Sequence, residues 1–253
     1  MNKHSTLAVS GKGGVGKSTV ATLLIRALME RENGAVLAVD ADPNSCLADY
    51  LGLKVEENIG LVREEVISNI TQIPPGMTKE RWISLRVQDC IVESKGLDLI
   101  EMGRPEGPGC YCYINNLLRE YEASVHRSYR YIVIDNEAGM EHLSRRSTLS
   151  LDYLFIVSDL SPAGLKASRR IYELSSSLNI VTKKRGLILN RVDENLRDEQ
   201  SRFVHETGLD VIGWLPVDPF IEKRGFAENS LLELPDDSPA LRAVRELVKT
   251  LDI

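Results

Sequence analysis

The sequence is poor in cysteine and in aromatic residues, and it has no long apolar run. Its 4 cysteines in 253 residues are too few for a disulfide scaffold, so we expect thiols in a reducing compartment. No stretch approaches the run of about 18 apolar residues that a membrane-spanning helix needs. The N-terminus also lacks the apolar segment of a signal peptide, and we therefore expect a cytoplasmic protein.

The sequence also lacks the positive charge that a broad nucleic-acid surface requires. Its net charge is −6, from 31 Lys and Arg against 37 Asp and Glu. Residues 238–251 carry an apolar stripe at helical spacing, but they include no aromatic residue and no basic cluster. We therefore expect no nucleic-acid partner and no membrane partner, and we expect this last helix to pack on the core.

No internal repeat, low-complexity tract or linker interrupts the chain. Its length suits one large domain, and we predict a single domain over residues 1–253. Residues 54–96 are the least regular part, with charged helical stretches and the break IPPG at 73–76. We expect this segment to be a peripheral elaboration of the sheet.

Short, nearly continuous apolar runs recur along the chain, as in strands that are covered on both faces of a parallel sheet. The runs that predict strands are 6–10, 35–40, 98–103, 131–135, 153–158, 186–191 and 211–215. Helical patterns follow the first run and recur at 164–178 and 238–251, where Ser238 is the expected N-cap. The alternation predicts an α/β fold, with a mostly parallel, doubly wound sheet of about seven to eight strands flanked by helices.

GKGGVGKS at 11–18 matches the phosphate-loop pattern G-x-x-x-x-G-K-[ST], with a strand expected before it and a helix after it. Its glycines allow a tight turn that points backbone N–H groups at phosphate oxygens. Lys17 should reach the β- and γ-phosphates, and the Ser18 hydroxyl should bind Mg²⁺. The predicted nucleotide-binding residues of this loop are Gly11, Lys12, Gly13, Gly14, Val15, Gly16, Lys17, Ser18 and Thr19.

A second lysine, Lys12, follows the first glycine of the loop. The resulting KGGVGKS resembles the deviant Walker A loop of the MinD/ParA/NifH group of ATPases. The resemblance implies a homodimer that forms on binding nucleotide, in which Lys12 is a catalytic residue that contacts phosphates held by the other subunit.

Two carboxylate motifs resemble the same group. VDADPNSC at 39–46 is similar to its switch I segment, which implies that Asp42 orients the attacking water and can contact Mg²⁺, while Asp40 fixes the magnesium environment. YIVIDNEAG at 131–139 has the Walker B pattern, which implies that Asp135 binds Mg²⁺ through a water and that Gly139 senses the γ-phosphate. Most ParA and MinD relatives have D-x-P-A-G here, and this chain lacks the proline.

Later strand ends carry the residues expected to hold the base of ATP or ADP. Asn190 in LILNRVD resembles the adenine-reading asparagine of the group. Pro216 and Asp218 in WLPVDP stand where the group closes over the base.

The pair Cys110 and Cys112 lies in RPEGPGCYCYINN at 104–116, which reads as a metal-binding loop. The pair, together with DNEAGMEHLSR and DADPNSCLADYLGL, resembles the CooC family of nickel-insertion ATPases for carbon monoxide dehydrogenase and acetyl-CoA synthase. Two thiolates hold a transition metal weakly, but a twofold axis would bring four together. The resemblance therefore implies a homodimer on binding metal, a client nickel enzyme, and Ni²⁺ at the shared site. Zn²⁺ is an alternative there, because thiolates bind both metals.

Other assignments stay open at this point. A buried structural role for the cysteine pair is one, a NifH-like iron–sulfur ATPase is another, and a ParA- or MinD-like positioning ATPase is a third. The remaining cysteines, Cys46 and Cys90, are expected to be buried as small hydrophobic side chains. An ordinary polar contact is expected for His142.

Overall fold

The computed structural model describes residues 4–31, 35–68, 73–103, 129–138, 151–177, 182–193, 201, 204–205, 207–225, 230–251 and 253. Strands of these residues form one eight-stranded sheet in the order β3-β4-β2-β5-β1-β6-β7-β8. All neighbouring strands are parallel except the pair β3 and β4. The strands are β1 Ser5–Gly11, β2 Val36–Ala41, β3 Ile91–Ser94, β4 Leu97–Glu101, β5 Tyr131–Ala138, β6 Tyr153–Ser158, β7 Lys184–Val192 and β8 Val211–Pro216.

The predicted α/β class and doubly wound, mostly parallel sheet are confirmed, and the seven expected strands are all present within a few residues of their predicted bounds. Strand β3 was not predicted. It is an edge strand of only four residues, half-exposed or exposed along its length, so it has no continuous apolar run. A tight turn through Gly96, at φ 77°, joins it to β4.

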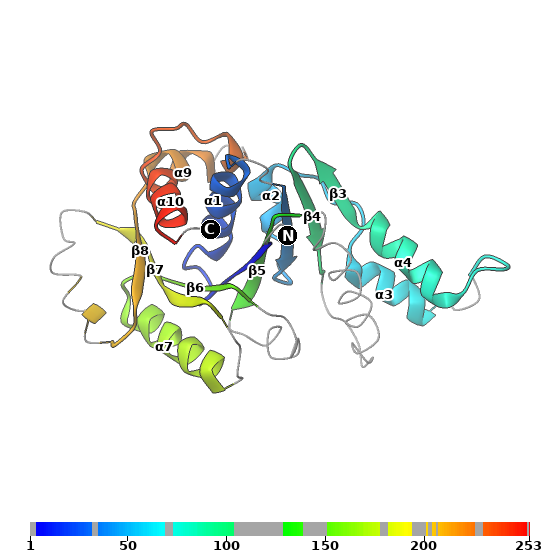
Figure 1. The fold of residues 1–253 in the computed structure, drawn as a ribbon, viewed down its shortest axis with the longest axis horizontal. Helices are drawn as coiled ribbons and strands as arrows, with labels where there is room; N and C mark the ends of the chain where they lie inside the picture. Colours follow the sequence, from blue (N-terminus) through cyan, green and yellow to red (C-terminus); the bar gives the residue numbers. More distant parts are fainter. Residues whose placement is uncertain are drawn as a thin grey trace.

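Helices cover both faces of the sheet (Figure 1). Helices α1, α9 and α10 lie on one face, α7 lies on the other, and α3 and α4 lie beyond the β3 edge. The helices are α1 Lys17–Met29, α2 Leu47–Leu51, α3 Ile59–Ser68, α4 Lys79–Asp89, α7 Pro162–Ser177, α9 Pro219–Gly225 and α10 Pro239–Thr250, with a 3₁₀ turn η3 at Leu231–Glu233.

The alternation of side chains along β1 shows how the two faces divide the core. Leu7 and Val9 pack in the cluster that includes the buried sides of α1 and α10. Ala8, between them, belongs to the second cluster, with residues of α3, α4 and α7. A strand buried on both faces needs apolar residues at every position, which explains the continuous runs in the sequence.

The last helix packs as the sequence predicts. Ser238 caps α10 by accepting a hydrogen bond from Leu241 N, and the apolar stripe of the helix is buried. Among the helices of the described residues, none combines the length and the apolarity that crossing a membrane demands.

One buried carboxylate, Asp218, accepts hydrogen bonds at the N-termini of both α9 and α10. Its Oδ1 accepts a hydrogen bond from Phe220 N at 2.9 Å, while Oδ2 accepts bonds from the Ser238 hydroxyl at 2.6 Å and Ala240 N at 3.0 Å. Asp218 therefore satisfies backbone donors at two helix N-termini, where its negative charge is also favourable.

We expect Asp218→Ala to lower the free energy of unfolding by about 2 kcal/mol, because it removes the acceptor of N–H groups at two helix N-termini. Chemical denaturation monitored by circular dichroism measures the change. Asp237→Ala removes an exposed carboxylate that lies just before α10 and should change stability by less than about 0.5 kcal/mol. Equal effects of the two substitutions would contradict the capping role.

Candidate functional site

The loop between β1 and α1 is shaped by glycines that no larger residue could replace without strain. Gly14 and Gly16 have φ values of 83° and 92°, in the left-handed region that favours glycine. Gly16 is the N-cap of α1, and a Cβ placed on it would clash with the Asn190 side chain. A Cβ at Gly11 would likewise clash with the Val157 carbonyl of β6.

Gly13 and Gly14, in contrast to Gly11 and Gly16, have space around them. A Cβ added to either would meet no atom of the described structure within 4 Å, and both glycines line an open space beside the loop. The loop leads directly into the first turn of α1, whose free N–H groups and positive dipole end favour an anion. The geometry is that of a phosphate cradle.

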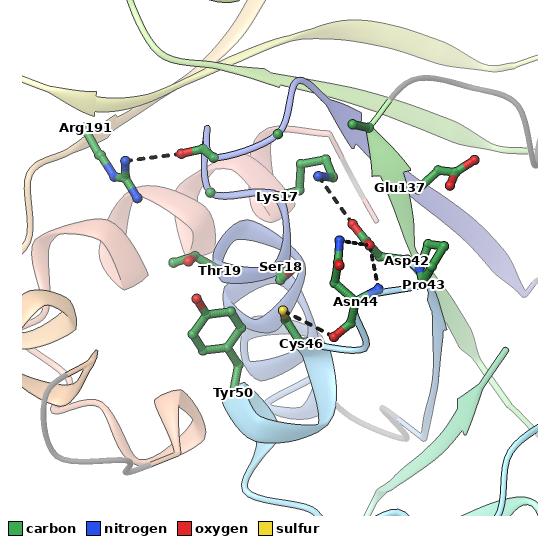
Figure 2. Close-up of a pocket in the computed structure, with 14 residues that line it drawn as sticks. Lys17, Ser18, Thr19, Asp42, Pro43, Asn44, Cys46, Tyr50, Glu137 and Arg191 are labelled. Atoms are coloured by element: carbon green, nitrogen blue, oxygen red, sulfur yellow. Dashed lines mark hydrogen bonds and ion pairs between the residues drawn. The ribbon is translucent and has the colours of Figure 1, made fainter. Parts of the chain in front are cut away.

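This space is a cavity of about 410 Å³, within the usual size range of ligand sites. Figure 2 shows its lining residues. They come from the phosphate loop and the first turn of α1, from the segment that joins β2 to α2, from α2 itself, and from the ends of β5 and β7: Gly13, Gly14, Gly16, Lys17, Ser18, Thr19, Asp42, Pro43, Asn44, Cys46, Tyr50, Glu137, Ala138 and Arg191.

A cation and a carboxylate face each other inside the cavity. Lys17 Nζ lies 3.7 Å from Asp42 Oδ2, and both side chains are largely buried. Asp42 Oδ1 accepts hydrogen bonds of 2.9 Å from both the backbone and the side-chain amide of Asn44 (Figure 2). These bonds fix the Asp42 carboxylate beside the loop, and Lys17 supplies the charge that a phosphate would meet.

Two further carboxylates lie beneath the cavity, side by side on β2 and β5, where Asp40 is in register with Asp135. Burial raises the pKa of Asp40 to about 6, although the N–H groups of Leu47 and Asp42 donate to it and lower the pKa in part. Burial raises the pKa of Asp135 to about 7, against the lowering effects of Ser18 and Lys17.

Neither oxygen of Asp135 has a hydrogen-bond partner of good geometry among the described residues. A buried carboxylate without donors is costly, and a hydrated divalent cation is the partner that would satisfy it. The residues present therefore fit Mg²⁺ held by the Ser18 hydroxyl, by Asp135 through water and, where it reaches, by Asp42. Within the described ranges no three His, Cys, Asp or Glu side chains gather as a direct metal cluster.

The remaining predicted residues are placed in different ways. Lys12 is exposed and does not line the cavity, and its predicted contact with a second subunit stays a prediction. Val15 is buried beneath the loop, and Thr19 lines the cavity. Gly139, His142 and the pair Cys110 and Cys112 lie outside the described residues.

The residues predicted to hold the base are engaged elsewhere. The Asn190 side-chain amide donates to Val15 O at 2.9 Å, which ties β7 to the phosphate loop. Asp218 caps two helices, and Pro216 ends β8. None of the three lines the cavity at the phosphate loop or the larger one next to it, which has a volume of about 1340 Å³. Their base-binding role stays a prediction.

Cys90 is buried, as predicted, but the same prediction for Cys46 is wrong, because its side chain is exposed. Cys46 is the N-cap of α2, and its thiol faces the cavity rather than the core (Figure 2). Sequence reasoning also missed Tyr50 of α2 and Arg191 at the end of β7. The spacing of Cys46 and Tyr50, i and i+4, puts both on one side of the helix and is the signal that could have indicated Tyr50.

Comparison with known proteins agrees with this geometry. Residues 6–230 match the family model described as the CobQ/CobB/MinD/ParA nucleotide binding domain. An uncharacterised ATP-binding protein of Methanocaldococcus jannaschii is 39% identical over 97% of this chain and 97% of its own length. The carbon monoxide dehydrogenase accessory protein CooC of Rhodospirillum rubrum is 31% identical over 93% of this chain and 91% of its own.

A solved structure shares the fold. The ParA family ATPase from Chlorobium tepidum superposes with a TM-score of 0.72 over 99% of this chain and all of that one, at 22% identity. With the glycine cradle, the buried Lys17 and the paired carboxylates, these matches establish that the chain belongs to the CobQ/CobB/MinD/ParA nucleotide-binding family and is an ATP-binding P-loop ATPase of the MinD/ParA type.

Proposed function

We propose that the protein is a dimeric, MgATP-dependent metallochaperone ATPase that binds nickel at Cys110 and Cys112 across the dimer interface. It would assist insertion of the nickel into carbon monoxide dehydrogenase or a related nickel enzyme. The observation that carries the proposal is the Cys-x-Cys pair in a chain 31% identical to a carbon monoxide dehydrogenase accessory protein over 93% of its length.

In the nucleotide part of the proposal, the positions of the described residues are compatible with the roles given to them. The loop N–H groups and Lys17 bind the β- and γ-phosphates, and Asp42 orients the attacking water beside them. Lys12 is exposed, so a second subunit can bring its own Lys12 to these phosphates. Mg²⁺ held by Ser18 and, through water, by Asp135 would supply positive charge that offsets the negative charge of the phosphates. Gly139 would sense the γ-phosphate.

The topology supports a link between the cysteine segment and the nucleotide. That segment begins just after β4, which is parallel to β2 and ends at the same edge of the sheet as the phosphate loop. Met102 N donates to Asp40 O at 2.8 Å, so the chain that leaves β4 is bonded to the start of the switch I segment. Movement of that segment on nucleotide binding would be passed to the residues that lead to Cys110.

Nickel is the cargo of the proposed reaction. Two thiolates from each subunit give four sulfur ligands, a number that suits square-planar Ni²⁺. Because metal and ATP would each favour the closed dimer, binding of one should strengthen binding of the other.

We expect the apo protein to bind nickel, with a stoichiometry of about one metal per dimer. Gel filtration with elemental analysis, with and without ADP or ATP, measures both metal and assembly. Cys110→Ala and Cys112→Ala should each lower metal affinity by at least about tenfold and leave ATP binding intact, because each removes half of the ligand set. Cys46→Ala is the matched control and should keep the metal.

Two outcomes would contradict the proposal. Full metal affinity in both Cys110→Ala and Cys112→Ala would exclude these thiols as ligands. A broad visible absorption band in anaerobically purified protein, bleached by dithionite, would point instead to the NifH-like iron–sulfur alternative.

A further inference from the structure

The segment DPNS at 42–45, which follows β2, has the composition of a tight turn. Pro43 fixes its own φ, and Ser45 N donates to Asp42 O at 2.9 Å, which closes the turn. Ser45 has a φ of 50°, in the left-handed region that residues other than glycine rarely adopt. Such a backbone persists only where the surrounding structure holds it, and it is frequent at functional sites.

The carboxylate of Asp40 holds the chain at both sides of this turn. Its Oδ1 accepts a hydrogen bond from Asp42 N at 3.1 Å, and its Oδ2 accepts one from Leu47 N, at the start of α2, at 3.0 Å. Asp40 is itself fully buried on β2. The path of the chain from β2 to α2 is therefore fixed by a residue of the central sheet.

Asn44 donates twice to one oxygen of Asp42. The bond from Asn44 N to Asp42 Oδ1, at 2.9 Å, is the usual contact of an aspartate that begins a turn. The bond from Asn44 Nδ2 to the same oxygen, also at 2.9 Å, is not required by the turn (Figure 2). Asn44 is exposed and lines the cavity, so core packing does not explain the orientation of its amide.

The two oxygens of Asp42 consequently differ. Oδ1 is held by Asn44, whereas Oδ2 lies 3.7 Å from Lys17 Nζ (Figure 2). The last torsion of an aspartate side chain has a broad, roughly twofold preference, so the carboxylate can turn unless its neighbours prevent it. Two donors on one oxygen restrict that rotation. Asn44 therefore determines which oxygen of Asp42 is directed toward Lys17.

We propose that Asn44 is a positioning residue for ATP hydrolysis, whose side-chain amide holds Asp42 Oδ1 and so presents Oδ2 to the attacking water. This inference rests on the proposed role of Asp42 in hydrolysis. When Lys17 turns to the phosphates of a bound nucleotide, Oδ2 loses its cation while Oδ1 stays bonded to Asn44. Oδ2 then accepts a hydrogen bond from the water and orients it toward the γ-phosphate.

A double-mutant cycle tests whether Asn44 acts through Asp42. The cycle compares the wild type, Asn44→Ala, Asp42→Asn and the variant with both substitutions. Single-turnover hydrolysis with protein in excess gives the rate, and calorimetric titration with a non-hydrolysable ATP analogue gives the affinity. Asn44→Ala removes only the side-chain bond, because the backbone N–H remains. Asn44→Asp is the matched variant, with nearly the same shape but no side-chain donor.

We expect Asn44→Ala to lower the hydrolysis rate by about tenfold, because a misdirected carboxylate orients the water poorly. Its affinity for the analogue should stay within about twofold of the wild type, since the inferred role concerns the water rather than the phosphates. Asn44→Asp should lower the rate at least as far, because it also places a like charge beside Asp42. In the Asp42→Asn background, Asn44→Ala should change the remaining rate by less than about twofold.

Three outcomes would overturn the role of Asn44 alone. The first is a wild-type rate in Asn44→Ala. The second is an equal loss of rate from Asn44→Ala in both backgrounds, which would show that Asn44 acts without Asp42. The third is a loss of affinity as large as the loss of rate, which would make Asn44 a binding residue. A wild-type rate in Asp42→Asn would instead overturn the proposed role of Asp42, and the inference with it.

Discussion

Replacing Asp42 by asparagine is expected to lower the rate of ATP hydrolysis by about a hundredfold or more while ATP binding stays as tight or becomes tighter. The carboxylate is fixed by two hydrogen bonds from Asn44 and lies 3.7 Å from Lys17 Nζ. Losing the group that positions the water removes a contribution typical of acid–base residues, about 10²- to 10⁴-fold. Losing its negative charge beside the phosphates should favour ATP in the ground state.

Single-turnover hydrolysis and equilibrium binding of ATP, measured on the same preparation, separate these two effects. Asp237→Asn is the control, because it removes an exposed carboxylate outside the cavity and should change neither quantity. A parallel loss of binding and hydrolysis in Asp42→Asn would show that the carboxylate supports the loop rather than the water. The measurement of ATP binding also tests the ion pair between Lys17 and Asp42. Without the Asp42 carboxylate, Lys17 is released from this pair and can interact with the phosphates instead.

Much of the fold could be predicted from the sequence because the central strands are buried on both faces. Runs such as YIVID and YLFIVS contain hardly any polar residue, and their short length and β-branched and aromatic residues favour a strand over a buried helix. Strand β3 escaped prediction because Ile91–Ser94 lies at an edge, where one side meets solvent and only a hairpin partner defines it.

The candidate site likewise contains residues that the sequence predicted and residues that it did not. Asp40 and Asp135 lie in the C-terminal halves of central strands, and Lys17 begins the helix that follows β1. Parallel strands bring such positions to one edge of the sheet. Tyr50 and Arg191 reach the cavity for reasons that short patterns do not contain. For Tyr50 the reason is the orientation of a five-residue helix, and for Arg191 it is a positive φ at a register shift. Cys46 was misplaced because its position depends on the same helix.

The buried carboxylate of Asp135 is expected to lower the stability of the protein when no cation is bound. Its side chain is fully buried, neither oxygen has a good donor among the described residues, and Asp40 and Asp42 add repulsion. The folded-state pKa of about 7 exceeds the unfolded value of 3.8. The folded protein therefore binds this proton more tightly, so the penalty grows with pH between these values and is complete above pH 7.

We therefore expect Asp135→Asn to raise the melting temperature of the nucleotide-free protein by several degrees at pH 8. Relief of about 1–3 kcal/mol, at about 2–4 °C per kcal/mol for a chain of this size, sets the scale. The same substitution removes the carboxylate that would hold a hydrated Mg²⁺, so the extra stabilisation that Mg²⁺ adds to ADP should disappear. Differential scanning calorimetry with EDTA, with ADP, and with ADP and Mg²⁺ measures both changes.

Two outcomes would contradict this prediction. A lower melting temperature of Asp135→Asn in EDTA would mean that the Asp135 carboxylate stabilises the protein without a cation. A retained response to Mg²⁺ would show that Asp135 is not needed to hold the cation beside Ser18 and Asp42.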